Sequence, residues 1–540
     1  MLGARSVGLS TILLLLPLAA ATQAQGRPPE AQPRGTAPVE FCASLVKFQM
    51  PSMAMTIEKA VPVAAKPAPS KPFEGPAYAM NRVTVALPSY CRADGTIHPH
   101  TGPDGKRYAI GFAINLPDRW NGRFLFQGGG GLDGVVREPL GAQASGDMPA
   151  LARGFAVVSM DSGHAGAMFD ASFNKDQESS LDFAYIAVGQ VTTVAKRIIA
   201  RYYGQPPRHS YFVGCSTGGR QAMLVSQRYP MEFDGVVAGD PAMRTGYSRI
   251  GQEWAAVAFN QAAPKDAAGK PMPGQTFSDS DKKLLTDAIL DACDALDGLK
   301  DGMIFNFRAC HFDPSTLTCK AEKTQSCLTS QQTAALEKAF AGPKDSLGES
   351  AYAAWPYDSG VAIYYPGTFG TFLPHSGPGL FGPPNLSLTV NVDHLEHQAS
   401  NDPVETLTDT TWTNLSTFSG RGGKLIFFHG LSDPAFSPLD TLGYYEKMAG
   451  ANGGDAQVRA WSRIFFVPGM NHCGGGPSLD RFDALGAVVN WVEKGQPPDA
   501  IVATGSHFPG ASRPLCAYPK HAQYKGSGDP QDAANFVCAD

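Results

Sequence analysis

Short apolar runs that alternate with helical patterns are the feature that most constrains how this chain folds. Because both faces of each run are apolar, the runs are typical of strands buried in a parallel sheet. Helical patterns lie between them, notably Ala184 to Tyr202 and Thr217 to Tyr229, so the sequence predicts an open α/β sheet. The expected strands are 123–127, 155–160, 210–214, 235–239, 424–430 and 463–469.

The chain is longer than one ordinary compact domain, at 540 residues, and its 43% hydrophobic content is enough for a large core. The alternation of strands and helices stops between about residues 243 and 412, where Gly, Pro and aromatic residues are frequent. We therefore expect a core of residues 76–242 and 413–540, interrupted by an inserted lid domain over 243–412. Residues 25–75 are rich in Pro and Ala, which predicts an extended or lightly ordered arm.

The first residues predict export from the cell. Arg5 precedes an apolar run over 11–21, and small residues follow, which is typical of a cleaved signal peptide over 1–24. A membrane anchor is the alternative, but the run is shorter than the roughly 20 residues that span a bilayer. We expect a secreted or periplasmic protein whose ten cysteines are oxidised.

The charge of the chain excludes some classes of partner. A net charge of -5 and a pI near 6.2 give no sign of the clustered Lys and Arg that nucleic acids or anionic membranes require. We therefore expect a small-molecule substrate, with no nucleic-acid or membrane partner. The sequence leaves the oligomeric state open.

A G-x-S-x-G pattern over 214–218 marks a candidate nucleophile, Ser216. It follows the expected strand 210–214 and begins a helical pattern, which is the setting of the nucleophile elbow in the α/β-hydrolase fold. Glycines at its two ends allow the sharp turn that this elbow needs. The alternative is a Gly-rich turn with an uninvolved serine.

A serine hydroxyl needs a base and an acid that orients the base, and this fold places them after later strands in the order Ser, Asp or Glu, His. Asp433 follows the strand at 424–430, and His472 follows the strand at 463–469. Alone, such an Asp is more often a turn former, and such a His more often a surface or core residue. Their joint placement predicts Asp433 as the acid and His472 as the general base.

Two cysteines support this pairing, because Cys215 adjoins Ser216 and Cys473 adjoins His472. If they bond, their α-carbons would lie roughly 4.4–6.8 Å apart, which would hold nucleophile and base together. The competing interpretation, a metal site with His472, lacks a fourth ligand at the usual spacing.

The oxyanion of the intermediate needs backbone N–H donors. One is expected from Thr217, the residue after the nucleophile, and the other from the four glycines 128–131 that follow the strand at 123–127. Gly131 is the first choice and Gly130 the second. The alternative is a flexible glycine loop.

With these residues the chain resembles the tannase and feruloyl esterase family, whose hallmark is a Cys-Ser pair, an Asp and a His-Cys pair. The likeness runs from GGGG at 128 through NHCGGGP at 471 to the tail RPLCAYPKHAQYKGSG. The segment SDPAFSPLDT at 432–441 resembles most the bacterial branch of terephthalate monoester hydrolases. The resemblance implies a carboxylic ester hydrolase acting on aromatic acid esters. It also implies the disulfides Cys215–Cys473, Cys293–Cys310, Cys319–Cys327 and Cys516–Cys538, with Cys42–Cys91 as the remaining pair.

An acidic loop in the lid, over 293–303, places three carboxylates within eight residues, between glycines. Such density of hard oxygen ligands suits calcium, although the spacing is not that of an EF-hand. The alternative is a solvated acidic turn. The loop resembles the family's structural calcium site, which would be formed by the side chains of Asp294, Asp297 and Asp301 and the carbonyls of Leu299 and Met303.

The substrate class follows from the resemblance and from one departure. Phe436 matches an aromatic wall of the terephthalate branch, and other lid aromatics are suited to stacking on a ring. No Arg occurs between Arg308 and Arg421, whereas that branch uses a lid arginine to bind the substrate's free carboxylate. We therefore expect feruloyl or other hydroxycinnamoyl esters, with gallate esters and terephthalate monoesters as alternatives. A peptidase on the same fold, or a calcium-dependent binding protein with an inactive fold, are the other classes.

Overall fold

The computed structural model describes residues 39–70, 73–74, 82–103, 105–366, 368–375 and 385–540. The predicted signal peptide over 1–24 and the beginning of the predicted arm lie outside these residues. The name lid segment denotes residues 243–412, and the core is the described remainder of the chain.

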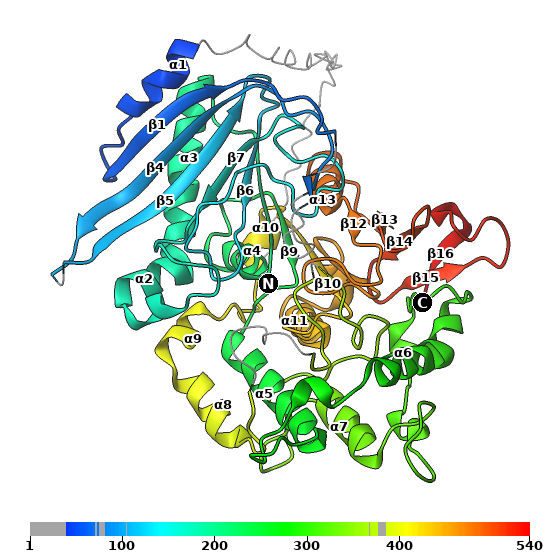
Figure 1. Cartoon of the computed structure of the whole chain (residues 1–540). Helices are drawn as coiled ribbons and strands as arrows, with labels where there is room; N and C mark the ends of the chain where they lie inside the picture. Colours follow the sequence, from blue (N-terminus) through cyan, green and yellow to red (C-terminus); the bar gives the residue numbers. More distant parts are fainter. Residues whose placement is uncertain (1–38, 71–72, 75–81, 104, 367, 376–384) are drawn as a thin grey trace, which may run out of the picture. The chain divides into compact units, whose positions relative to one another are not determined.

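A nine-stranded mixed sheet forms the centre of the core (Figure 1). The strands β7, β6, β8, β9, β10 and β11 pair with one another in parallel. The pairs β1–β4, β4–β5 and β5–β7 are antiparallel. All six apolar runs predicted as strands are found in it, which confirms the α/β fold class. In sheet order the strands are β1 (Met55–Val63), β4 (Tyr90–Thr101), β5 (Arg107–Pro117), β7 (Ala156–Met160), β6 (Arg123–Gln127), β8 (His209–Cys215), β9 (Gly235–Gly239), β10 (Lys424–Gly430) and β11 (Ser462–Val467).

Both faces of the parallel part of the sheet are buried. In β10, Leu425 and Phe427 pack into one apolar cluster with side chains of α3 and α4, whereas Ile426 and Phe428 pack into a second cluster with α13. Successive side chains of a strand point to opposite faces, so a run must be apolar throughout when helices cover both. This burial is why the six runs could be recognised.

Three strands of this sheet, β1, β4 and β5, were not predicted. β1 lies within the stretch expected to be a lightly ordered arm, and that prediction is wrong for Met55–Val63, which pair with β4. Met55 and Ile57 are buried in the core, and the Cys42–Cys91 disulfide ties the preceding segment to β4. An edge strand alternates between buried and exposed residues and therefore lacks the continuous apolar run by which the central strands were found.

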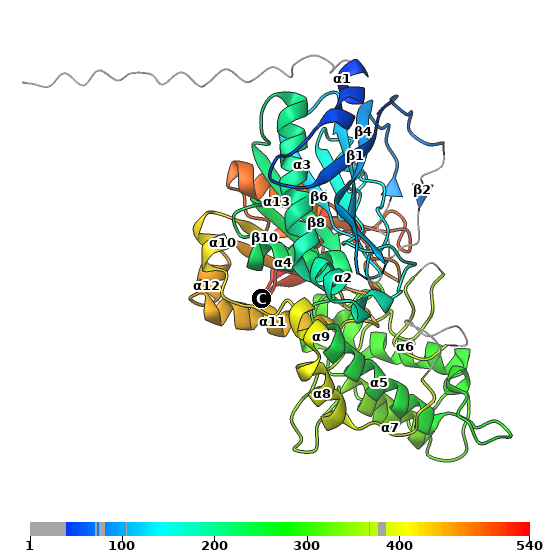
Figure 2. The ribbon, with the colours of Figure 1, turned by 90° about the vertical axis from the view of Figure 1, so that its left-hand side faces the viewer.

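Helices cover the sheet and make up most of the regular structure of the lid segment. Figures 1 and 2 both show α5, α6, α7 and α8 gathered below the sheet. Within the described residues the lid segment adds no strand to the nine-stranded sheet. The helices are α1 (Val39–Ser44), α2 (Gln177–Leu181), α3 (Ala187–Tyr203), α4 (Thr217–Arg228), α5 (Thr245–Ala262), α6 (Asp279–Cys293), α7 (Ser330–Phe340), α8 (Val392–Asn401), α9 (Pro403–Thr408), α10 (Ser416–Gly420), α11 (Pro438–Ala451), α12 (Asp455–Val458) and α13 (Ala484–Lys494).

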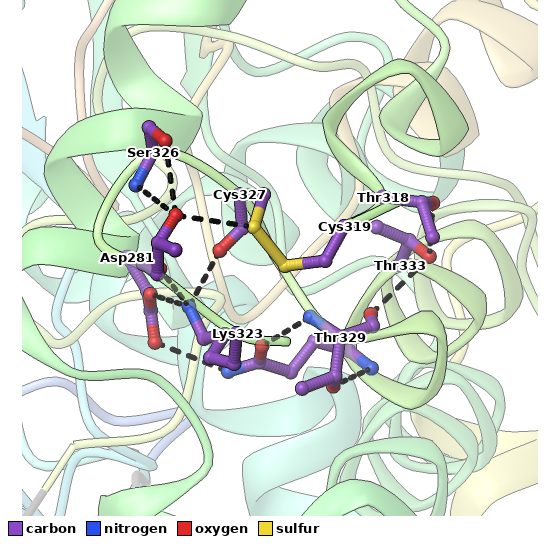
Figure 3. The surroundings of a disulfide bond; sticks show 10 residues. Asp281, Thr318, Cys319, Lys323, Ser326, Cys327, Thr329 and Thr333 are labelled. Carbon is purple, nitrogen blue, oxygen red and sulfur yellow. Dashed lines mark hydrogen bonds and ion pairs between the residues drawn. A yellow bond between two sulfur atoms is a disulfide. The ribbon is translucent and has the colours of Figure 1, made fainter. Parts of the chain in front are cut away.

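The lid segment is held by an apolar cluster of its own side chains, by disulfides and by polar contacts rather than by a sheet. Around the Cys319–Cys327 disulfide, Lys323 pairs with Asp281 of α6 and donates to the Cys327 carbonyl at 2.6 Å (Figure 3). Thr329 caps α7 in a reciprocal capping box. These contacts join the beginnings of α6 and α7 into one unit.

The end of the chain forms small antiparallel sheets beside the core. Cys516 and Cys538 are bonded there, as the resemblance implies. No helix among the described residues has the length and apolar character needed to cross a membrane. The short strands outside the large sheet are β2 (Phe73–Glu74), β3 (Arg82–Val83), β12 (Arg481–Phe482), β13 (Ala500–Thr504), β14 (Ser512–Cys516), β15 (His521–Tyr524) and β16 (Phe536–Ala539).

Candidate active site

Ser216 lies in the turn between β8 and α4, as the sequence predicts. Its backbone has φ 63° and ψ -124°, a conformation that is strained for a residue with a side chain and typical of a nucleophile elbow. A Cβ atom at Gly214 would lie 2.4 Å from the Gly218 carbonyl oxygen, so the turn requires glycine. The Ser216 side chain is partly exposed, and its hydroxyl has no hydrogen-bond partner within the described part of the chain.

Asp433 and His472 come together although 39 residues separate them. The Nδ1 atom of His472 lies 2.7 Å from Oδ2 of Asp433, and both side chains are buried. Oδ1 of Asp433 accepts hydrogen bonds from the amides of Ala435 at 2.7 Å and Phe436 at 3.1 Å. Although burial alone would raise it, the charge of His472 and hydrogen bonds from His429 and His472 hold the pKa of Asp433 well below its usual range.

A disulfide between Cys215 and Cys473 joins the nucleophile turn to the base loop, with 6.0 Å between the two α-carbons. Ser216 and His472 are the immediate chain neighbours of the two bonded cysteines. No hydrogen bond joins Ser216 to His472 among the described residues, so their direct contact stays a prediction; catalytic hydrogen bonds are often long without substrate. All five disulfides have the pairing that the resemblance implies.

Gly130 and Gly131, the two glycines predicted as oxyanion donors, differ in whether their amides already have a hydrogen-bond acceptor. The Gly130 amide donates to Oδ1 of Asp133 at 2.8 Å, so it already has an acceptor within the loop, and its role as an oxyanion donor stays a prediction. The Gly131 amide has no acceptor among the described residues. Leu132 donates to the Thr217 hydroxyl at 3.0 Å and so ties the loop to the beginning of α4. Thr217, as the first residue of a helix, has no intrahelical acceptor for its amide.

Asp133 and Gln221, which were not predicted from the sequence, stabilise the glycine loop through hydrogen bonds to its amides. Gln221 donates to Asp133 and accepts a hydrogen bond from the Gly129 amide at 3.1 Å, and Ser162 also donates to Asp133. All three side chains are buried. Because their partners are backbone amides and each other, no spacing in the sequence indicates the network.

His429 and Asp240 were also missed. His429 is the sixth residue of β10, and its Nε2 atom lies 3.2 Å from the same oxygen of Asp433 that His472 contacts. Asp240 follows β9 and lies 3.7 Å from His429. The parallel pairing of β9 with β10 brings the two together. The i, i+4 spacing of His429 and Asp433 at a strand end could have indicated a contact between these two residues, but no spacing indicates Asp240.

Aromatic rings surround the base. The rings of Phe436 and Phe369 lie with centroids 5.3 and 4.8 Å from that of His472, and substrate binding by Phe436 stays a prediction. Phe169, from the loop after β7, packs edge-on against Phe369 at 5.5 Å, and its amide donates to the Gly131 carbonyl. The walls beside the base are therefore apolar and aromatic.

The lid segment touches both catalytic loops. Trp355 donates to the carbonyl of Asp433 at 3.0 Å. Asp358 accepts hydrogen bonds from the Ser432 hydroxyl at 2.6 Å and from the Gly469 amide at 2.7 Å. One lid carboxylate thus joins the acid loop to the base loop, and burial raises its pKa to about 6.

The acidic loop of the lid lies apart from these residues. Asp294 accepts hydrogen bonds from the amides of Asp301 and Gly302, so the loop closes on itself. Burial raises the pKa of Asp297 to about 7, and the neighbouring charges of Asp301 and Asp294 add to this shift. The three carboxylates do not each bring an oxygen within 4.8 Å of the others in the described structure, and Asp301 also pairs with Arg513.

The parallel strands of this mixed sheet end in the strained turn at Ser216 and in the loops that carry Asp433 and His472, which is the arrangement of the α/β-hydrolase fold. A family model for tannase and feruloyl esterase matches residues 91–371 and 383–539. The chain belongs to this family and is a carboxylic ester hydrolase.

Named relatives agree with this assignment. The chain is 39% identical over 519 residues to a mono(2-hydroxyethyl) terephthalate hydrolase from Piscinibacter sakaiensis, covering 84% of this chain and 85% of that one. It is 30% identical over 528 residues to a probable feruloyl esterase from Arthroderma benhamiae, covering 92% and 93%. The crystal structure of feruloyl esterase B from Aspergillus oryzae superposes with a TM-score of 0.73 at 26% identity, covering 93% of this chain and all (100%) of that one.

Proposed function

We propose that the protein is a secreted serine esterase that cleaves aromatic acid esters, with Ser216 as nucleophile, His472 as general base and Asp433 as the acid. One observation carries this proposal: the 2.7 Å contact between Asp433 and His472, in a loop that a disulfide joins to the turn bearing Ser216. The strained backbone of Ser216 supports the assignment, because such strain persists where it serves function. The lid segment would be an inserted domain that covers the site.

The reaction would proceed by acyl transfer in two steps. Ser216 attacks the ester carbonyl while His472 accepts its proton, and the alcohol leaves with that proton. The amides of Thr217 and Gly131 stabilise the oxyanion. Water, activated by His472, then hydrolyses the acyl-enzyme and releases the aromatic acid.

Among aromatic acid esters, we expect hydroxycinnamate esters to be the preferred substrates. Phe436 and Phe369 beside His472 offer apolar ring faces. No Arg occurs between Arg308 and Arg421, so this part of the chain supplies no guanidinium for a substrate carboxylate. Terephthalate monoesters are the second candidate, because the relative with 39% identity is named for such a substrate. Gallate esters remain a third.

We also propose a structural calcium ion in the acidic lid loop. Burial raises the pKa of all three carboxyls, and the charge of Asp301 adds to this shift at Asp294 and Asp297; a cation stabilises the charged form of such groups. The carbonyls of Leu299 and Met303 accept no hydrogen bond from the described residues, which leaves them available as ligands. Binding would require the three carboxylates to move closer together.

A substrate panel tests the esterase proposal. Ser216→Ala should abolish hydrolysis of p-nitrophenyl acetate and methyl ferulate, whereas Ser226→Ala, in the same helix and away from the turn, should keep both activities. An active Ser216→Ala enzyme would contradict the assignment of the nucleophile.

A matched pair of substrates tests the specificity. We expect kcat/KM for methyl ferulate to exceed that for monomethyl terephthalate, and dimethyl terephthalate, which lacks the free carboxylate, to be cleaved faster than the monoester. A preference for the monoester over the diester would instead establish carboxylate recognition by another residue.

A further inference from the structure

Two histidines share one oxygen of the acid. Oδ2 of Asp433 lies 2.7 Å from Nδ1 of His472 and 3.2 Å from Nε2 of His429. His429 and Asp433 are both fully buried (0% exposed), so water does not compete for either group. The two-step acyl transfer uses only His472 and leaves the second imidazole without a role.

The surroundings of His429 fix where its proton lies. Its Nε2 atom faces Oδ2 of Asp433 at 3.2 Å, the Phe436 carbonyl at 3.1 Å and Oδ1 of Asp240 at 3.7 Å. Carboxylates and carbonyls only accept hydrogen bonds, so Nε2 must carry a hydrogen. On the other side of the ring, Nδ1 lies 2.9 Å from the Thr441 hydroxyl, which sets the ring's orientation.

His429 also stands between two buried carboxylates. Asp240 accepts a hydrogen bond from the Gly430 amide at 2.9 Å and is completely buried. Burial raises the pKa of Asp240 to about 6, an effect that His429 opposes and Asp433 increases. Although burial alone would lower it, the charges of Asp240 and Asp433 raise the pKa of His429. The imidazole therefore interacts favourably with both acids, which would otherwise repel each other.

We propose that His429 is a positioning residue for the triad, whose Nε2–H donates to Asp433 and holds that carboxylate in the orientation that His472 requires. The inference rests on the proposed function and deepens it, because it adds a fourth residue through which the acid acts. The ionisable groups that face His429 are Asp240 after β9, Asp433 after β10 and, beyond Asp433, His472 after β11.

Removing the donor should change two measurable properties. Asp433 would be free to rotate, so fewer molecules would hold His472 correctly, and kcat would fall while KM stays nearly constant. The carboxylate would also lose a partner for its charge and hold the proton on His472 more tightly. The acidic limb of the kcat/KM profile should then move to higher pH, which a purely structural role would not predict.

The experiment compares His429→Gln with His429→Asn. The Gln amide nitrogen reaches the position of Nε2 and can donate to Asp433, whereas the Asn amide nitrogen reaches only that of Nδ1, beside Thr441. Since a hydrogen bond to a charged group contributes about tenfold to a hundredfold, the Asn variant should lose that much in kcat. The Gln variant should keep kcat within a few-fold and retain the wild-type pH profile. Both are compared at equal concentrations of active sites, titrated with a fluorophosphonate.

Equal kcat values and pH profiles for the two variants would overturn the inference. If the Asn variant does not fold, Thr441→Val tests the same geometry, because it removes the hydroxyl that orients the His429 ring. A smaller loss of kcat, with the acidic limb of the kcat/KM profile displaced to higher pH, supports the proposal. A wild-type pH profile overturns it. Ser216→Ala separates this from the proposed function. If that variant is inactive while His429→Asn behaves as wild type, only the role of His429 is wrong.

Discussion

The core and the lid segment are stabilised in different ways. In the core, backbone pairing between nine strands positions the ends of β8, β10 and β11, where Ser216, Asp433 and His472 lie. The lid segment instead has helices packed around an apolar cluster of its own, with two disulfides and polar contacts, and it contributes none of the three proposed catalytic side chains. Yet Trp355 donates to the loop that carries Asp433, and Asp358 accepts hydrogen bonds from that loop and from the loop that carries His472. The sheet therefore determines where these loops begin, whereas hydrogen bonds from lid side chains stabilise their conformation.

The largest expected effect comes from removing the disulfide at the active site. Cys215 and Cys473 are 258 residues apart, and losing a native disulfide typically costs about 2–5 kcal/mol, more for long loops. The Cys215→Ala/Cys473→Ala double variant should lose most of its kcat as well as stability, because the nucleophile turn and base loop become independent. Steady-state kinetics on p-nitrophenyl acetate and thermal unfolding measure the two effects.

The control is Cys319→Ala/Cys327→Ala, whose disulfide closes only 8 residues in the lid segment. It should be destabilised less and keep its kcat at temperatures where it remains folded. Equal losses of kcat in both double variants would show that the active-site disulfide has no special role in holding the site.

A second, smaller effect tests the lid's contact with the catalytic loops. Asp358→Asn replaces the charged oxygen that accepts from both the Gly469 amide and the Ser432 hydroxyl with a neutral amide oxygen, so both hydrogen bonds become weaker. We expect kcat to fall about tenfold, the equivalent of one lost charged hydrogen bond. Asp281→Asn is the matched lid variant, because Asp281 is also buried but contacts only the lid's own Lys323, Ser278 and Gln332. It should lower the melting temperature without changing kcat; a loss of kcat from Asp281→Asn, but not from Asp358→Asn, would reverse the comparison.

The central strands, the nucleophile turn and the order of acid and base could be predicted because each depends on residues close in sequence. The run at 424–430 is apolar throughout, and Asp433 follows it directly. His429, at the end of that run, could not be assigned a role, because its partner Asp240 is distant in the chain and meets it only through the pairing of β9 with β10. Asp133 was missed because it binds amides of its own loop, which any residue can supply.

The smallest effect, on stability alone, concerns two carboxyls whose pKa burial raises to about 7: Asp297 in the lid and Asp182 in the core. Each binds its proton more tightly in the folded state than in the unfolded state, so each makes the protein less stable as pH rises from about 4 to 7.

Calcium should offset this loss of stability only at Asp297, so the melting temperature should rise on adding calcium, and more at pH 8 than at pH 5. Asp297→Asn should abolish the calcium response and flatten the pH dependence, whereas Asp182→Asn should flatten it and keep the response. A response that survives Asp297→Asn would place the ion elsewhere, and the lid would then be stabilised by its apolar cluster, its disulfides and its polar contacts without a metal in this loop.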